Sequence, residues 1–433
     1  MTDSPTLLWG VSAEQLFQDV LFNPDYLALH AGVRGVDSLA LPGFRHATGI
    51  CAVGDGAVED LETPWGYGGP VAADAGAMDA GMAAWRAQQR ERGRVAEFVR
   101  LHPFINPMAV ASHFDMLAFD RPTVVLDLSQ SLDVRRSFYN RSARRSLKKA
   151  EECLTVRQLG PDDGAVLQDC YEAGLKWNDA AERYWLEPAF YGRLLAAPWC
   201  MAWAVEFEGR AVAALAIVRG GGFVHTHLAG NYPEARDLGA AYILHQTAID
   251  ACAQLGDRWF HFGGGRSRLS DDVLLQFKAK FSPLRAHYYV GGLIFDRDAY
   301  AKLGGASGGM FLGYRSPITA ASNTVTDPTP DAPLSVVAVA EDHLFDLFGL
   351  ACDPARLARR ALAAPPDWSA FSDQFERLRR DGAITMVCRG NSVAGFLVVW
   401  PEAGSELLCV AGEEPHGVAS VLGGAVDIAG STK

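Results

Sequence analysis

The hydrophobic and polar positions follow the same order twice along the chain. In the first copy, an irregular loop at 62–70 holds three glycines and two prolines, so neither a helix nor a strand continues through it. Residues 77–91 are rich in Ala, Met, Gln and Arg and predict a helix. Residues 95–101 then predict a strand that ends before His102.

The second copy begins with a strand of alternating character at 223–228. After a loop at 229–237, apolar residues at helical spacing predict a helix over 238–255, and Gly256 is placed to end it. A strand at 258–262 then runs into three glycines. The repeated order predicts an α/β protein made of two halves with mixed sheets.

The rest of the chain adds a linker and a smaller unit. Ser, Thr, Asn, Asp and Pro dominate the linker, while β-rich runs at 384–388 and 393–399 flank a hairpin signal. The pattern continues with a helix near 418–428, after which no closing strand follows. We therefore expect four segments: a first half at 1–130, a second half with a basic helical segment at 131–315, a linker at 316–333 and a small C-terminal α/β unit at 334–433.

Composition narrows the class of protein. A chain of 433 residues suits two or three domains, and its net charge of −12 disfavours non-specific binding to DNA. It contains no apolar run of membrane-spanning length, and its polar N-terminus lacks the pattern of a secretory signal. The eight cysteines are scattered without a Cys-x-x-Cys pair. We expect a cytoplasmic protein without a metal site or a membrane span.

Two polar features could carry proton transfer. His102 and His261 lie at or inside strand ends, where a neutral imidazole could take a proton from an attacking amine. Lys278 has apolar neighbours on both sides, which suggests an enclosed ammonium that binds an anionic substrate or donor. The alternatives are structural histidines and an ion pair between Lys278 and Asp272.

Other stretches could bind substrates. Small residues at a helix start, as in 236–241, let backbone N–H groups approach phosphate oxygens, although a closely packed helix start explains the same pattern. Glycines at 263–265 let a ligand or another backbone come close, or form a plain turn. Trp65 and Tyr67, set among glycines, could line a pocket or pin a turn. The basic cluster could bind phosphates or form a solvated helix face; its members are Arg141, Arg144, Arg145 and Lys148.

Together these stretches resemble the FemAB-like acyltransferases, the Fem ligase and BioF2-like group of the GNAT superfamily. The most specific block has a strand ending in Gly-Gly-Gly, followed at fixed spacing by Asp-x-Leu, Phe-Lys and Phe-Ser at 272–282. The resemblance covers roughly residues 7–303. Its blocks are 64–70 with 97–104 and Asn106, 123–128 running into 140–151, 171–191, and 225–230 with 261–265, 272–282 and Tyr300.

The resemblance implies tandem GNAT-like domains that form an amide between an activated acyl or aminoacyl donor and a small-molecule amine. The co-substrate would be acyl-CoA or aminoacyl-tRNA, with tRNA as a partner in the second case and no bound cofactor in either. The spacing at 236–241 matches the segment that cradles the coenzyme A pyrophosphate in that superfamily. The implied donor-binding residues are Leu228, Ala229, Arg236, Gly239, Ala240 and Ala241. The implied acceptor-binding residues are Trp65, Tyr67, Gly68, Gly263, Gly264, Gly265 and Asp272.

Two further expectations remain open. The long helical hairpin of the tRNA-dependent cell-wall enzymes is not evident in the sequence, so cell-envelope and natural-product acceptors both stay open. The C-terminal unit is expected to be a partial GNAT-like module that supports packing or oligomerisation. The rival class is a non-catalytic GNAT-like binding or scaffolding protein, which the acidic charge and the histidine candidates also allow.

Overall fold

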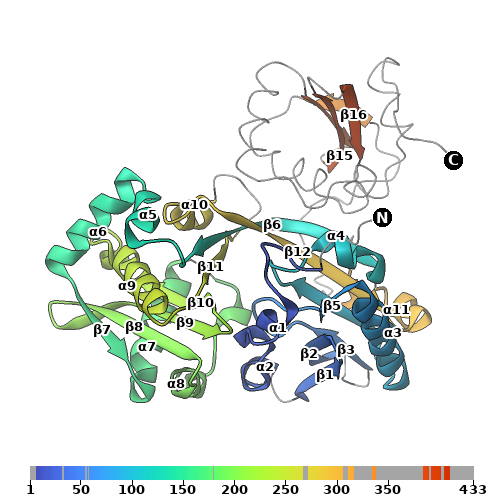
Figure 1. The fold of residues 1–433 in the computed structure, drawn as a ribbon, viewed down its shortest axis with the longest axis horizontal. Coiled ribbons are helices and arrows are strands. Elements are labelled where there is room, and N and C mark those ends of the chain that lie inside the picture. Colours follow the sequence, from blue (N-terminus) through green and yellow to red (C-terminus); the bar gives the residue numbers. More distant parts are fainter. Residues whose placement is uncertain are drawn as a thin grey trace.

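The computed structural model describes residues 6–31, 34–53, 56, 58–178, 180–266, 272–305 and 311–315, and four strands between 334 and 409. Its main body is a twelve-stranded mixed sheet with helices packed against it (Figure 1). The strand order is β1-β2-β3-β5-β12-β6-β11-β10-β9-β8-β7, with β4 beside β2. The predicted mixed α/β fold is confirmed.

The first part of the sheet comes from the N-terminal third of the chain. Asp74 caps the helix α3 by accepting the Ala77 N–H, and one face of α3 buries Trp85. The Trp85 indole and the His46 imidazole both hydrogen-bond the buried Glu97 carboxylate, each at 2.8 Å. The elements here are α1 (Ala13–Leu16), η1 (Val20–Phe22), α2 (Pro24–Ala31), β1 (Val36–Leu41), β2 (Phe44–Val53), β3 (Val58–Glu62), β4 (Val71–Ala72), α3 (Ala75–Glu91), β5 (Ala96–Leu101), α4 (Pro107–Val110) and η3 (Ala111–His113).

The second part has helices on both faces of its strands. Along β9, Ala214, Ala216 and Val218 pack in one hydrophobic cluster with α7 and α8. The alternate residues Leu215 and Ile217 pack in the other cluster with α9, as the two-residue period of a strand requires. The elements are α5 (Leu132–Ser137), α6 (Arg141–Cys153), β7 (Thr155–Leu159), η4 (Pro161–Asp163), α7 (Gly164–Trp177), η5 (Glu182–Tyr184), α8 (Pro188–Ala196), β8 (Cys200–Phe207), β9 (Arg210–Gly220), β10 (Phe223–Asn231), η6 (Pro233–Ala235), α9 (Ala240–Gln254) and β11 (Trp259–Gly264).

The two parts form one continuous sheet because they share their central strands. β6 (Met116–Asp127) precedes the expected boundary at residue 130 but pairs with β11 of the second part. β12 (Arg285–Ile294) follows the second part yet pairs with both β5 and β6. Helices α10 (Val273–Ala279) and α11 (Arg297–Lys302) and the turn η8 (Gly313–Arg315) lie on either side of β12 in the sequence.

Each part contains the arrangement that the sequence predicted twice. In the first, α3 connects β3 to the parallel strand β5, and in the second α9 connects β10 to the parallel strand β11. Strands β10 and β11 continue to Asn231 and Gly264, beyond the expected ends at 228 and 262, and α9 begins at Ala240 rather than at residue 238. Strand β11 therefore takes in two of the three glycines that were expected to follow it.

The C-terminal strands form a separate four-stranded antiparallel sheet in the order β13-β14-β15-β16. The predicted hairpin corresponds to β14 and β15. The linker expected at 316–333 and the helix expected near 418–428 lie outside the described residues. The strands are β13 (Leu334–Val337), β14 (Ile384–Arg389), β15 (Ser392–Trp400) and β16 (Gly404–Cys409). Over the described part of the chain, no helix combines the length and the apolar character needed to cross a membrane.

Candidate active site

The parallel strands β10 and β11 separate partway along their length. They pair at Phe223, Val224 and His225 only, opposite 259–261. Beyond that point β10 stays paired with β9 and β11 stays paired with β6, and each of these pairings contains a bulge at the point of separation. The facing edges of β10 and β11 beyond His225 thus have no ladder between them, and such edges can hydrogen-bond an extended ligand.

Several predicted site residues meet where the strands separate. The Tyr67 ring packs edge-on against His261 with ring centroids 5.1 Å apart, and the Lys278 ammonium donates to the Gly264 carbonyl at 2.7 Å. Gly263 has a φ of +78°, and a Cβ built on it would lie 3.4 Å from the Lys278 Nζ and 3.7 Å from the Tyr67 oxygen. The glycine therefore leaves room between these polar atoms that a larger residue would fill.

The surroundings of Lys278 make its charge easy to lose. Burial lowers the pKa of Lys278 to about 8, although the Asp272 carboxylate acts in the opposite direction. Asp272 is fixed in place because it caps α10 through the Leu275 N–H and accepts the Arg266 N–H, both at 2.9 Å. Gly265 leaves space for it, since a Cβ there would lie 2.5 Å from an Asp272 oxygen and would displace that carboxylate.

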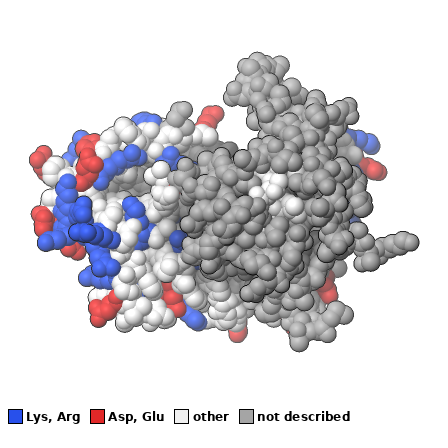
Figure 2. Space-filling view, turned by 90° about the horizontal axis from the view of Figure 1, so that it is seen from above, with Lys and Arg blue, Asp and Glu red and all other residues white. Residues whose placement is uncertain are grey.

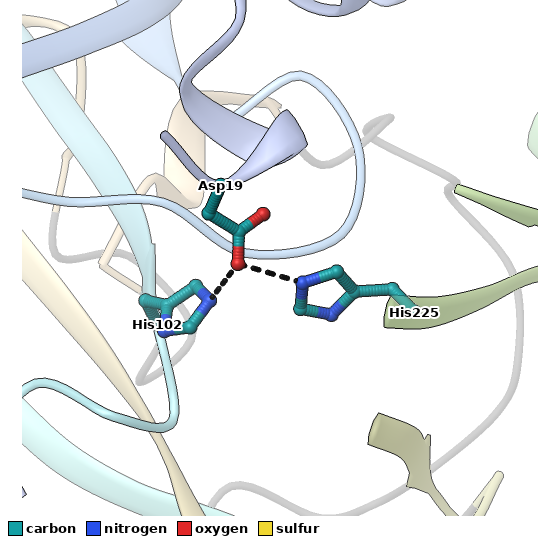
Figure 3. A group of neighbouring side chains, drawn as sticks. All are labelled: Asp19, His102 and His225. Atoms are coloured by element: carbon teal, nitrogen blue, oxygen red, sulfur yellow. Dashed lines mark hydrogen bonds and ion pairs between the residues drawn. The ribbon is translucent and has the colours of Figure 1, made fainter. Parts of the chain in front are cut away.

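Behind His261 lies a chain of buried polar side chains. The His261 Nδ1 lies 3.2 Å from the His225 Nδ1, and the His225 Nε2 lies 2.9 Å from the Asp19 carboxylate. His102 approaches the same carboxylate oxygen at 3.3 Å (Figure 3). These residues come from the N-terminal segment, the exit of β5 and the paired ends of β10 and β11.

Glycines in the β9–β10 turn bring the N-terminal segment to this position. A Cβ on Gly220 would lie 2.7 Å from the Gln18 carbonyl oxygen, and a Cβ on Gly221 would lie 2.8 Å from the Gln15 carbonyl oxygen. Larger side chains at the turn would push the segment away. The close approach therefore seats Asp19 against His225.

Hydrogen bonding fixes where the protons lie in this group. The His102 Nδ1 accepts the Phe104 N–H at 3.3 Å, so its Nε2 carries the proton and faces Asp19. Burial by itself would raise the pKa of Asp19, but His225 and His102 hold that pKa well below its usual range. Burial, followed by the nearby His225, lowers the pKa of His261 well below its ordinary value. His261 is therefore neutral near pH 7.

The same three residues have the composition of a metal site. One ligand atom each from Asp19, His102 and His225 lies within 4.8 Å of the others. A metal would need the lone pair of the His102 Nε2, whereas the hydrogen bond that Nδ1 accepts from Phe104 assigns the proton of a neutral His102 to Nε2. The geometry fits a hydrogen-bonded carboxylate better than a metal ligand set.

Other predicted acceptor residues have a clear structural setting. Trp65 stacks on His30 with ring centroids 5.5 Å apart. It also contacts the ring of His227, which lies two residues after His225 on β10. Gly68 bridges to β5, where its N–H donates to the Arg100 carbonyl at 2.7 Å. These contacts hold the loop in place, and the rings of Trp65 and Tyr67 contact different neighbours. An acceptor role for these residues stays a prediction.

The predicted donor residues lie farther along β10 and at the start of α9. Leu228 is buried and Ala229 is exposed. Gly239 caps α9 with a φ of +79°, and a Cβ there would lie 2.4 Å from the Ser146 carbonyl oxygen of α6. Close packing on α6 therefore explains the glycine at this position. Arg236 lies over the Trp177 ring, and the donor role of 236–241 stays a prediction.

The predicted basic cluster is an exposed face of α6, which packs against α9. Lys and Arg side chains gather at the left end of the molecule in Figure 2, the end that carries α6 in Figure 1. Within the described residues, no carboxylate forms an ion pair with the cluster members Arg141, Arg144, Arg145 and Lys148. This face is therefore available to an anionic ligand.

Sequence reasoning missed Asp19 and His225 as members of the site. The alternation in 223–228 places His225 and His227 two residues apart, and this signal could have joined His225 to the neighbouring His261. Asp19 has no comparable signal, because it lies 206 residues from its hydrogen-bond partner.

Comparisons with known proteins agree with this architecture. Residues 136–272 match the family model of the acetyltransferase (GNAT) domain. The crystal structure of FemX aligns over 66% of this chain and 94% of its own, with 10% identity and a TM-score of 0.53. L-PGS from Bacillus licheniformis aligns over 65% and 90%, with 13% identity and a TM-score of 0.46. A GCN5-related N-acetyltransferase from Kribbella flavida aligns over 63% and 95%, with 13% identity and a TM-score of 0.35.

No curated protein matches the sequence. At 10% identity, the likeness to FemX concerns the fold alone. The predicted resemblance to Fem-like GNAT proteins is confirmed at that level: residues 136–272 match the GNAT acetyltransferase domain, and about two thirds of the chain shares the fold of FemX.

Proposed function

We propose that this protein is an N-acyltransferase that joins an activated acyl or aminoacyl group to the amine of a sugar, an amino acid or a peptide-like acceptor. The observation that carries the proposal is the opening between β10 and β11, with His261 and Lys278 at its apex. The buried Nε2 of His261 has no hydrogen-bond partner among the described residues. A buried acceptor atom of this kind suits a substrate N–H.

The reaction needs a positioned amine and somewhere for its proton to go. The amine nitrogen attacks the carbonyl carbon of the donor, and the neutral His261 takes a proton from that nitrogen. The bond from the carbonyl carbon to the donor oxygen or sulfur then breaks, and the leaving alkoxide or thiolate takes up the proton that His261 received, which returns His261 to its neutral form. Backbone N–H groups of β10 after Leu228 would stabilise the oxyanion, and the Lys278 ammonium would bind an anionic part of a substrate.

The donor is proposed to carry phosphate groups. Phosphates of acyl-CoA or of aminoacyl-tRNA would lie near the start of α9 and on the basic face of α6, which is adjacent to it. The two donors differ in size and charge. Aminoacyl-tRNA would cover much more of α6, so its binding would depend more steeply on salt.

Two measurements test the function. Thermal unfolding is followed with acyl-CoA, with free coenzyme A and with charged or uncharged tRNA, and the true donor is expected to raise the unfolding temperature. Mass spectrometry then measures acyl transfer from that donor to a panel of amines. Arg145→Ala with Lys148→Ala should weaken donor binding, whereas Arg193→Ala, which removes a single positive charge on α8, serves as the control. Donor binding without transfer to any amine class would favour the non-catalytic alternative.

A further inference from the structure

We propose that Asp19 and His225 form a relay that fixes the tautomer of His261 and stabilises its charged form during the reaction. This inference rests on the proposed function, because it assigns roles behind the proposed base. Asp19 and His225 would be positioning residues, since they would act through His261 and not on the substrate. His261 alone would contact the substrate amine.

The direction of the relay follows from what each atom can donate. An ionised carboxylate only accepts, so the His225 Nε2 carries a proton and donates it to Asp19 at 2.9 Å. The His225 Nδ1 is then an acceptor, and the His261 Nδ1 must donate to it across 3.2 Å. This arrangement leaves the lone pair of His261 on Nε2, the atom without a partner in the described part of the protein.

The burial of Asp19 supports a role beyond folding. The residue is 1% exposed, and its ion-pair partners among the described residues are two imidazoles rather than a Lys or Arg. Its other oxygen accepts the Leu21 N–H at 2.9 Å. A buried carboxylate without a Lys or Arg partner depends on its histidine neighbours and its hydrogen bonds to stay ionised. Its negative charge becomes favourable when His261 takes a proton and the relay turns positive.

Several charged or titratable groups act on His261. Lys278, His102 and His225 disfavour its protonated form, whereas Asp19 favours it, and the Tyr67 ring packs against it. Removing the charge of Asp19 would therefore lower the pKa of His261 further. The acidic limb of the pH–rate profile is expected to move to lower pH in Asp19→Asn while the rate on the plateau falls.

The decisive experiment combines NMR with kinetics on the full chain. Long-range nitrogen–proton NMR on the unmodified protein is expected to show His261 protonated at Nδ1 and unprotonated at Nε2. In Asp19→Asn this tautomer should be lost, and turnover should fall on the order of 100-fold to 10⁴-fold. The control Asp37→Asn removes another buried carboxylate, one that bonds the Ser38 N–H, and should change neither the tautomer nor the rate.

Three results would overturn the relay. One is a wild-type His261 protonated at Nε2, a measurement that needs no variant to fold. Another is an unchanged tautomer and rate in a folded Asp19→Asn protein. The third is the detection of one metal ion per chain by elemental analysis of the wild type, together with loss of that metal in Asp19→Asn. If no donor or amine supports transfer, the proposed function fails, while the NMR result still decides whether Asp19 controls His261.

Discussion

Replacing Lys278 by Met separates a functional lysine from a structural one. Met keeps much of the length and apolar volume of the side chain but has no charge and cannot donate to the Gly264 carbonyl. If Lys278 serves binding or catalysis, its buried charge lowers the free energy of unfolding. We therefore expect Lys278→Met to lose turnover without losing stability near pH 7.

The expected size of the effect follows from the pKa. Burial lowers the pKa of Lys278 from 10.5 to about 8, and a tenfold change in equilibrium is about 1.4 kcal/mol, so charging this lysine costs the folded state ~3.5 kcal/mol. Below pH 8 the lysine is charged in both the folded and unfolded states, and the whole cost is present. Between pH 8 and 10.5 the unfolded chain holds more protons, so stability rises with pH.

The assay compares urea unfolding of the wild type and Lys278→Met at pH 7 and pH 10. The wild type should gain roughly 2–3 kcal/mol relative to the variant over this interval, because other titrating groups are common to both proteins and cancel. Lys280→Met is the matched control, since Lys280 ends the same helix and donates to the Tyr242 hydroxyl at 3.1 Å. A difference independent of pH, or full turnover in Lys278→Met, would refute the reasoning.

Three further outcomes are expected. Glu97→Ala leaves the buried His46 without its carboxylate and should cost about 3–5 kcal/mol in unfolding free energy, measured by urea titration. Gly230→Ala places a Cβ 2.3 Å from the Cys170 carbonyl oxygen, so α7 must shift from β10, and the unfolding temperature should fall by the equivalent of about 1–3 kcal/mol. Deleting the residues after Pro333 should cause aggregation or lost oligomerisation in gel filtration while some transfer activity remains. Full loss of turnover in a folded truncated chain would contradict the assigned role.

Local patterns were sufficient to predict the repeated elements. The spacing of apolar residues in 77–91 and 238–255 reflects helix faces that pack on the sheet, and the alternation in 223–228 reflects a strand with two covered faces. The same patterns do not predict that the two parts of the sheet share β6 and β12. Strand order depends on contacts between segments far apart in the chain, and no local pattern records them.

The residues of the candidate site likewise fall into those that local sequence predicts and those that only the fold brings together. His261, Lys278 and the glycines between them lie within eighteen residues, so a strand end followed by a short helix brings them together. Tyr67 was predicted from its own setting, an aromatic residue among glycines. Asp19 was not, because an isolated aspartate near a helix start reads as a cap, and it does accept the Leu21 N–H.

The segment that matches the GNAT domain contains only part of the candidate site. Residues 136–272 contain His225, His261 and the helix proposed to bind the donor. They do not contain Asp19 or Tyr67, which come from the first part and meet the second because β6 and β12 join the two parts into one sheet, and they end before Lys278, which follows β11 on α10. The matched segment therefore has the separated strands and both histidines but lacks the Asp19 carboxylate and the Lys278 ammonium. The whole main body, rather than either half, is the smallest unit that holds the proposed site.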